Sequence, residues 1–197
     1  MGDAKTGGLI AAFRFPDARA WTEAAILFMI FAGLAALIGI GSGLFEDSPH
    51  FDTSLLVTAV VAVFIPAMGE ELVFRVWLLP WPAGLAIPPS RPTTSAPQDE
   101  VEGKFSNPPH AEVRAKASLE ARLLFILPSL ALFVLWHPVQ VWLGLPLAQA
   151  VFLDWRFLIT AALLGIACTI SWQRSGSIWP AIAIHWAAVV GWKALLA

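Results

Sequence analysis

Long apolar stretches separated by polar connections are the dominant pattern of this chain of 197 residues. A helix that crosses the ~30 Å hydrocarbon core of a bilayer needs about 20 mostly apolar residues, and several uncharged stretches approach or exceed that length. We predict helices over residues 21–44, 55–79, 123–145, 157–172 and 179–196. Because a lipid-exposed backbone must satisfy its own hydrogen bonds, the predicted fold class is all-α: a polytopic integral membrane helix bundle of about five transmembrane helices.

The polar connections differ in charge. The basic N-terminal segment 1–20 and a loop over residues 80–110, rich in Pro, Ser and Thr, fall on one side of a five-helix topology, and so does the short connection that contains Arg174. Positively charged connections stay in the cytoplasm, so we predict a cytoplasmic N-terminus and an external C-terminus. We divide the chain into the cytoplasmic segment 1–20 and a membrane domain 21–197, with the Pro-rich loop in the cytoplasm. A surface helix is expected over residues 111–122.

The composition supports a membrane setting. Hydrophobic residues make up 58% of the chain and charged residues 13%, about half the ~25% of an ordinary soluble domain. The chain has 10 Trp and no Tyr, and most of the Trp residues fall near predicted helix ends, where aromatic belts meet the lipid headgroups. The net charge of -2 and the absence of a basic stripe in the sequence argue against a nucleic-acid partner. The expected partner is the lipid bilayer.

The second predicted helix carries charges inside an apolar segment. At a rise of ~1.5 Å per residue, Glu70 lies ~14 Å from the predicted end of the helix at Leu79. Such charges cost a few kcal/mol each and persist mainly where they pair or act. Glu71 and Arg75 are four residues apart, so we expect an ion pair. Glu70 points ~100° away from Glu71, so we expect it to be held protonated or to find a partner on another helix, which suits a general base.

Two histidines occur in other predicted helices at a compatible depth. His137 follows Phe133 by four residues, so the two share one face of the third helix, and Pro138 is expected to disturb that helix. His185 lies ~9 Å from the start of the last helix at Trp179. Three helices thus each contribute a proton-active side chain, and the sequence predicts one cluster inside the membrane.

These motifs resemble those of the CAAX protease and bacteriocin-processing family, the glutamate-type intramembrane proteases similar to type II CAAX prenyl endopeptidases. The resemblance rests on E-E-x-x-x-R at Glu70, then F-x-x-x-H at Phe133, then His185, in this order on successive apolar segments. It covers residues 55–196. It implies an integral protein of the prokaryotic cytoplasmic membrane that hydrolyses a peptide bond in a membrane-associated peptide or protein, without a covalent intermediate.

The resemblance also implies roles for individual residues. Glu70 and His137 would activate a water, His185 would stabilise the oxyanion, and Glu71 with Arg75 would orient the site. Phe133, Trp136 and Val189 are candidate substrate-binding residues, and for Phe133 and Trp136 packing is the alternative role. Many family members carry Asn or Asp four residues after the last histidine, where this chain has Val189, so an expected polar group is missing.

Other interpretations of the same residues stay open. The charges could lock helices together structurally, which would fit a catalytically weak or inactive member that acts as a membrane scaffold or immunity-type protein. A transporter or proton relay would need a polar path to both faces, which the third helix does not offer. We expect no cofactor and rank a divalent metal such as zinc lower, because H-E-x-x-H is absent from the sequence and Arg75 would repel a cation beside Glu71.

Overall fold

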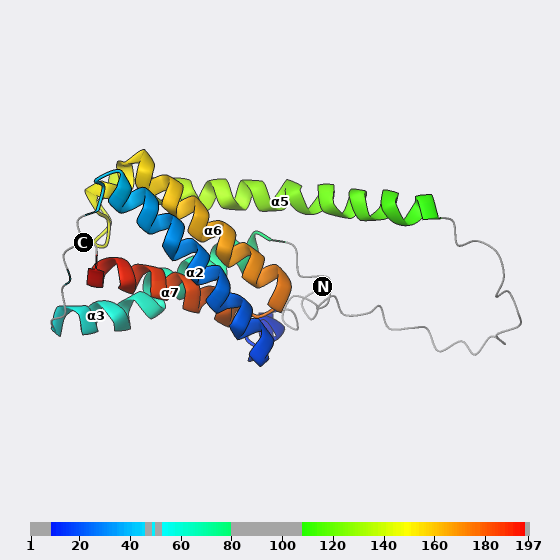
Figure 1. The fold of residues 1–197 in the computed structure, drawn as a ribbon, viewed down its shortest axis with the longest axis horizontal. Coiled ribbons are helices and arrows are strands. Elements are labelled where there is room, and N and C mark those ends of the chain that lie inside the picture. The colour runs from blue at the N-terminus through cyan, green and yellow to red at the C-terminus, as the bar shows by residue number, and fades with distance from the viewer. Residues whose placement is uncertain (1–8, 46–48, 50–52, 80–107, 196–197) are drawn as a thin grey trace, which may run out of the picture.

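The computed structural model describes residues 9–45, 49, 53–79 and 108–195, with the side chains of residues 108–121 excluded. Helices make up almost all of this part of the chain (Figure 1). The α-helices are α2 (Ala18–Gly41), α3 (Thr53–Ala62), α4 (Gly69–Glu71), α5 (Pro108–Trp142), α6 (Trp155–Ser175) and α7 (Ile178–Leu195). Two π-helices, η1 (Val63–Met68) and η2 (Leu72–Trp77), and a short 3-10 helix, η3 (Ala150–Leu153), complete the described elements.

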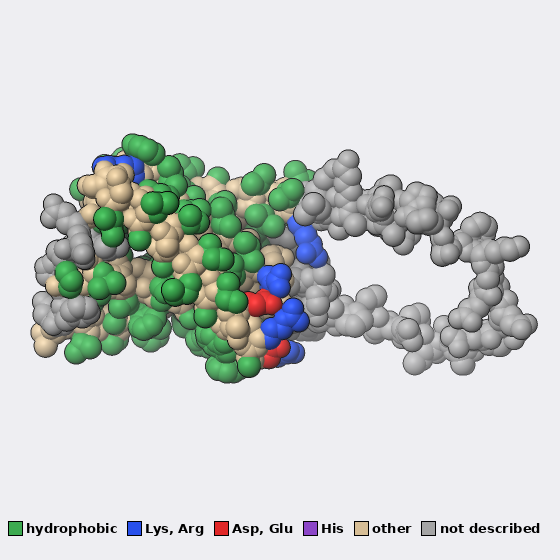
Figure 2. Space-filling view, in the orientation of Figure 1, with side chains coloured by type: hydrophobic (Ala, Val, Ile, Leu, Met, Phe, Trp, Pro, Cys, Tyr) green, Lys and Arg blue, Asp and Glu red, His purple; other side chains and the backbone are tan. Residues whose placement is uncertain are grey.

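Five helical segments are long and apolar enough to cross a membrane, which confirms the predicted fold class. They are Ala18–Gly41, Thr53–Trp77, Arg122–Trp142, Trp155–Ser175 and Ile178–Leu195. Large apolar side chains such as Met29 and Leu37 are about 70% exposed on α2, and apolar side chains cover much of the surface in Figure 2. In lipid, such a surface faces the acyl chains, so the chain is an integral membrane protein.

Helix α6 lies in the middle of the bundle. It packs against α2, α5 and α7, and α7 also contacts α2 and α3. The side chains of α6 are accordingly the most extensively buried of the five segments. One buried cluster joins Phe74, Phe133, Leu164, Cys168 and Ile184 from four different helical segments. These contacts fix α5, α6 and α7 around the place where the second span carries its charges.

The second span is not the uninterrupted helix that the apolar pattern predicts. Ile65 has a non-helical backbone (φ -138°, ψ 107°) and is followed by Pro66, which has no N–H to donate to the preceding turn. The wider π turns of η1 and η2 enclose the three-residue helix α4. Because π segments occur often at functional sites, the irregular backbone marks the same region as the two glutamates of α4.

The third span was expected to follow a surface helix and to be disturbed at Pro138. Helix α5 begins at Pro108, so the segment 111–122 is helical, as expected, and leads directly into the span. It then continues through Pro128 and Pro138 to Trp142. The helix therefore continues past Pro138, where a disturbance was expected, and Nδ1 of His137 lies 3.0 Å from the carbonyl oxygen of Phe133 in the same turn.

Charged side chains collect at one end of the bundle, which we call the charged end (Figure 2). It contains Arg14, Arg19, Glu23 and Arg174, and the Arg174 guanidinium pairs with the Glu23 carboxylate at 2.8 Å. The N-terminal segment docks beside it, because Ser177 Oγ donates to the carbonyl of Arg14. The fold thus brings together three arginines that the charge pattern assigned to one side. The predicted loop 80–110 lies outside the described residues except for its last three, which begin α5.

Candidate active site

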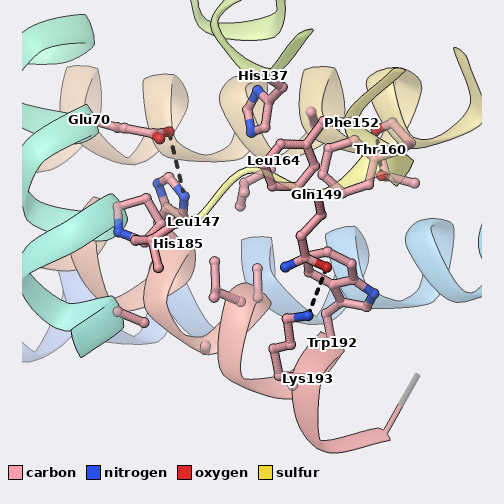
Figure 3. A pocket seen from close by; sticks show the side chains of 18 of the residues that line it. Glu70, His137, Leu147, Gln149, Phe152, Thr160, Leu164, His185, Trp192 and Lys193 are labelled. Carbon is pink, nitrogen blue, oxygen red and sulfur yellow. Dashed lines mark hydrogen bonds and ion pairs between the residues drawn. The ribbon is translucent and has the colours of Figure 1, made fainter. Parts of the chain in front are cut away.

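A large, mostly apolar cavity of about 1270 Å³ lies inside the bundle. Its wall is built from the second half of α2, from α3 and α4, from the end of α5, from the start of α6 and from α7. Its ionisable lining residues are Glu70, His137, His185 and Lys193. Glu70, His137 and His185 come from three different helices and lie near one another in Figure 3, so the predicted clustering of these side chains is present.

Glu71 is the buried centre of an ion-pair network. Its Oε2 lies 3.2 Å from Nε of Arg75, and both side chains are 0% exposed. Its Oε1 lies 2.9 Å from Nδ1 of His185. Arg75 is also held by α6, because its guanidinium donates to the carbonyl of Gly165 at 3.2 Å. The expected pair between Glu71 and Arg75 therefore exists, and it ties the second span to both α6 and α7.

Glu70 finds its partners on other helices. This is one of the two outcomes expected for a carboxylate without a partner in its own helix. Nε1 of Trp136 donates to Oε1 of Glu70 at 3.0 Å. The other carboxylate oxygen, Oε2, lies 3.9 Å from Nε2 of His185 (Figure 3) and makes no hydrogen bond to any residue that the structure describes. One oxygen of Glu70 is thus fixed by an indole, while the other faces an imidazole across a gap that a shared water can bridge.

Each of the two histidines uses its ring nitrogen Nδ1 for a contact that orients the ring. A carbonyl oxygen can only accept, so His137 donates from Nδ1 to Phe133 and leaves Nε2 available. His185 likewise directs Nδ1 at a Glu71 oxygen and Nε2 at Glu70. Because hydrogen bonding by one ring nitrogen sets the role of the other, the Nδ1 contacts orient both rings, with Nε2 of His137 left available and Nε2 of His185 facing Glu70.

The ring of Phe133 packs against three charged or titratable side chains of the site. Its ring is 0% exposed and lies 5.3 Å from the ring of His137 and 5.8 Å from that of His185. The Arg75 guanidinium sits 4.9 Å above the same ring. Phe133 is not among the described residues that line the cavity, and its contacts fit the packing role that was the alternative.

The sequence matches the family described as type II CAAX prenyl endopeptidase Rce1-like over residues 52–190. This match covers more than half of the chain and includes α4, α5, α6 and the histidine of α7. The chain belongs to this family. Comparisons with curated proteins and with solved structures found no match. Membership in the CAAX prenyl endopeptidase family, together with the five spans, supports an intramembrane CAAX-type protease.

Within this CAAX endopeptidase family member, Trp136 and Val189 both line the cavity, as a substrate-binding role requires. The sequence did not indicate that Trp136 would hydrogen-bond Glu70, because spacing along one helix carries no information about a partner on another. Gln140 was also missed: it is buried, lines the cavity and follows Trp136 by four residues. Its position one turn after Trp136 was the available signal.

The potential metal ligands of the site do not form a ligand set for a metal ion. Among the described residues, no three His, Cys, Asp or Glu side chains are gathered as a metal site requires. Both oxygens of Glu71 face other partners, Arg75 and His185. A cation at this position would also meet the Arg75 guanidinium, so the residues present fit a hydrogen-bonded cluster better than a ligand set.

Proposed function

We propose that the protein is an intramembrane endopeptidase that hydrolyses a peptide bond in a membrane-associated peptide or protein. The observation that carries the proposal is the pair formed by Oε2 of Glu70 and Nε2 of His185, 3.9 Å apart at the wall of a large apolar cavity. Such a cavity can hold an extended peptide, and the pair offers an acceptor and a possible donor to a water and a carbonyl. Family membership supports the same reaction class.

In the proposed mechanism, Glu70 takes a proton from a water that His137 helps to position through its free Nε2. The water oxygen attacks the carbonyl carbon of the peptide bond, and the negative charge collects on the carbonyl oxygen. His185 in its protonated form donates from Nε2 to that oxygen. Glu70 then passes its proton to the leaving amine as the carbon–nitrogen bond breaks. No covalent intermediate with the protein forms.

Donation from Nε2 in this mechanism requires His185 to carry both ring protons, because Nδ1 already faces a Glu71 carboxylate oxygen. Glu70 and Glu71 supply two negative charges, and Arg75 supplies one positive charge. An imidazolium at His185 makes the sum zero, which matters in a buried site because uncompensated charge is costly there. Glu71 lies between Arg75 and His185 and orients both. We therefore assign Glu71 and Arg75 an orienting role.

The expected orientation in the prokaryotic cytoplasmic membrane remains part of this proposal. The charged end carries Arg14, Arg19 and Arg174, and an excess of positive charge is typical of the cytoplasmic side of a membrane protein. The cavity is lined by the second half of α2 and the second half of α7, so it extends from Glu70 away from the charged end. Substrate would then occupy the half of the bundle farther from the cytoplasm.

The proposal is tested by Glu70→Gln in purified protein, with a membrane-extract peptide library as substrate. We expect cleavage to be lost while insertion and melting temperature are retained, because the amide keeps the shape but cannot take the proton. Glu23→Gln, which changes a carboxylate at the charged end, is the matched control and should cleave normally. Full cleavage by Glu70→Gln would remove this residue from the role of base. Addition of a chelator to wild type tests the metal-dependent alternative.

Val189 favours a second candidate, a catalytically inactive scaffold or immunity-type protein. This side chain lines the cavity one turn after His185 and has no polar group to assist an oxyanion. A scaffold would show no cleavage by wild type in the same assay. Substitution of His137 or His185 would then change only stability or capture of a partner.

A further inference from the structure

The side chain of Gln140 on α5 is a polar group in the wall of an apolar cavity. It lines the cavity and is 8% exposed. Within the described part of the chain, its amide makes no hydrogen bond. A buried polar group costs free energy unless it is hydrogen-bonded, so the amide of Gln140 needs a partner that enters the cavity.

The end of α5 does not account for this side chain. The backbone carbonyl of Gln140 accepts from the N–H of Leu145 at 3.0 Å and so helps to end the helix. Every residue supplies such a carbonyl, so this contact does not require an amide side chain. Trp136, one turn earlier on the same face, is different because its side chain is held by Glu70. The amide of Gln140 lies on that face and holds no other helix.

The chemistry of the amide fits the main chain of a peptide. Gln carries no charge, offers two N–H donors and accepts at its oxygen. One residue of an extended peptide presents an N–H and a carbonyl to the same side, as in the hydrogen-bonded pairs of a sheet. A Gln side chain can therefore form two hydrogen bonds with one such residue, one in each direction. An ion would match only the donors or only the acceptor of this amide.

The spacing from Trp136 to Gln140 indicates where on the peptide the contact falls. The proposed reaction centre lies at the level of Trp136, whose indole bonds Glu70. Four residues correspond to about 6 Å along the axis of α5, and an extended peptide covers ~3.3 to 3.6 Å per residue. Gln140 therefore lies at the level of a substrate residue about two positions from the cleaved bond.

We propose that Gln140 binds the main chain of the substrate about two residues from the cleaved bond, through the N–H and the carbonyl of one residue. The inference rests on the proposed protease function and makes Gln140 a substrate-binding residue. The contact holds the peptide extended along the cavity and fixes which bond meets Glu70. It does not select side chains, so peptides of different sequence bind in the same alignment.

The test replaces single peptide bonds of one substrate by esters, which lack the N–H donor. The parent is a decapeptide without Asn or Gln that wild type cleaves, so all of its amides are in the main chain. Each bond except the cleaved one is replaced in turn. In wild type, we expect one ester, about two residues from the cleaved bond, to lower kcat/KM about threefold to tenfold. The other esters should have smaller effects.

The variant Gln140→Met keeps the length of the side chain and removes both kinds of hydrogen bond. It should lower kcat/KM on the parent peptide about 5- to 150-fold, as expected for two hydrogen bonds, and mainly through KM. The ester that weakens wild type should cause no further loss in this variant, because the partner of the missing N–H is already gone.

Gln149→Met is the matched control for the loss of an amide from the same wall. Gln149 also lines the cavity, but its amide oxygen accepts from the ammonium of Lys193 at 2.9 Å (Figure 3). This variant should keep the ester pattern of wild type. Loss of the pattern in both variants would contradict a contact specific to Gln140.

Two results would overturn the inference and leave the protease standing. One is a wild type that tolerates all esters equally, which is decisive even where Gln140→Met does not fold. The other is a folded Gln140→Met protein that shows the same sensitivity to each ester as wild type, because the main-chain contact would then lie elsewhere.

A binding arm covers the case in which wild type cleaves nothing. Fluorescence anisotropy then measures the affinity of wild type and Gln140→Met for labelled decapeptides and for their esters. A loss of affinity at one ester position that depends on Gln140 supports the main-chain contact even though the protease proposal has failed. Equal affinities of the two proteins, or no binding of any peptide, overturn the contact.

Discussion

The hydrogen bond from Trp136 to Glu70 allows a quantitative prediction. The indole N–H is the only donor that the described residues offer to Oε1 of Glu70, at 3.0 Å. Trp136→Phe keeps an aromatic ring and removes this donor. A hydrogen bond to a charged group contributes about 1.5 to 3 kcal/mol. At about 1.36 kcal/mol per tenfold change in rate, kcat/KM should fall roughly 10- to 150-fold. The loss follows because Oε2 is no longer held toward His185.

The matched control is Trp186→Phe. Trp186 also neighbours a histidine of the proposed active site, but its Nε1 donates to the backbone carbonyl of Ala59 on α3 and not to a carboxylate. The assay measures kcat/KM against pH on any peptide that wild type cleaves. Trp136→Phe should change both the rate and the pH profile, whereas Trp186→Phe should leave the profile in place. A Trp136→Phe enzyme within about threefold of wild type at every pH would refute the positioning role.

Two further predictions concern stability. Glu71→Gln should destabilise the protein by about 3 to 5 kcal/mol, because it leaves Arg75 charged and buried. The double variant Glu71→Leu with Arg75→Leu should lose less stability, because no charge is left unpaired. Equal melting temperatures for wild type and Glu71→Gln in detergent would contradict this. Asp154 caps α6 and bonds Arg156, which holds the pKa of Asp154 below its usual 3.8. The stabilising contribution of Asp154 is therefore fully present above about pH 3.8 and is lost as the pH falls through the lower pKa of the folded state. Asp154→Asn should melt at a lower temperature than wild type at pH 7 and differ little from it in strong acid.

Much of the fold follows from the order of apolar and polar residues. Five spans were predictable because each must be long and apolar by itself, whatever its neighbours are. The pair of Glu71 and Arg75 was predictable for a similar local reason, since a spacing of four residues brings two side chains together on any helix. These features depend on the geometry of a single helix, which the sequence determines directly.

The features that could not be predicted depend on how helices meet. Nothing in the sequence near Trp136 shows that its indole would reach Glu70, and nothing near Gln149 shows that it would accept from Lys193. Both contacts join elements that are distant in the chain. The break at Ile65 also escaped the apolar pattern, because hydrophobicity does not change where the backbone leaves the helix.

Gly165 makes the packing of α5 against α6 possible. A Cβ atom at this position would lie 2.6 Å from the side chain of Leu130 and 3.0 Å from the ring of Phe133. Leu130 can rotate away, but the ring of Phe133 is in contact with Phe74, His137 and His185 and has no free direction to move. One methyl group at position 165 would therefore displace the ring of Phe133, and this ring would in turn displace both imidazoles. The alignment of the cluster thus depends on a residue that contributes no side chain and is not among the described residues that line the cavity.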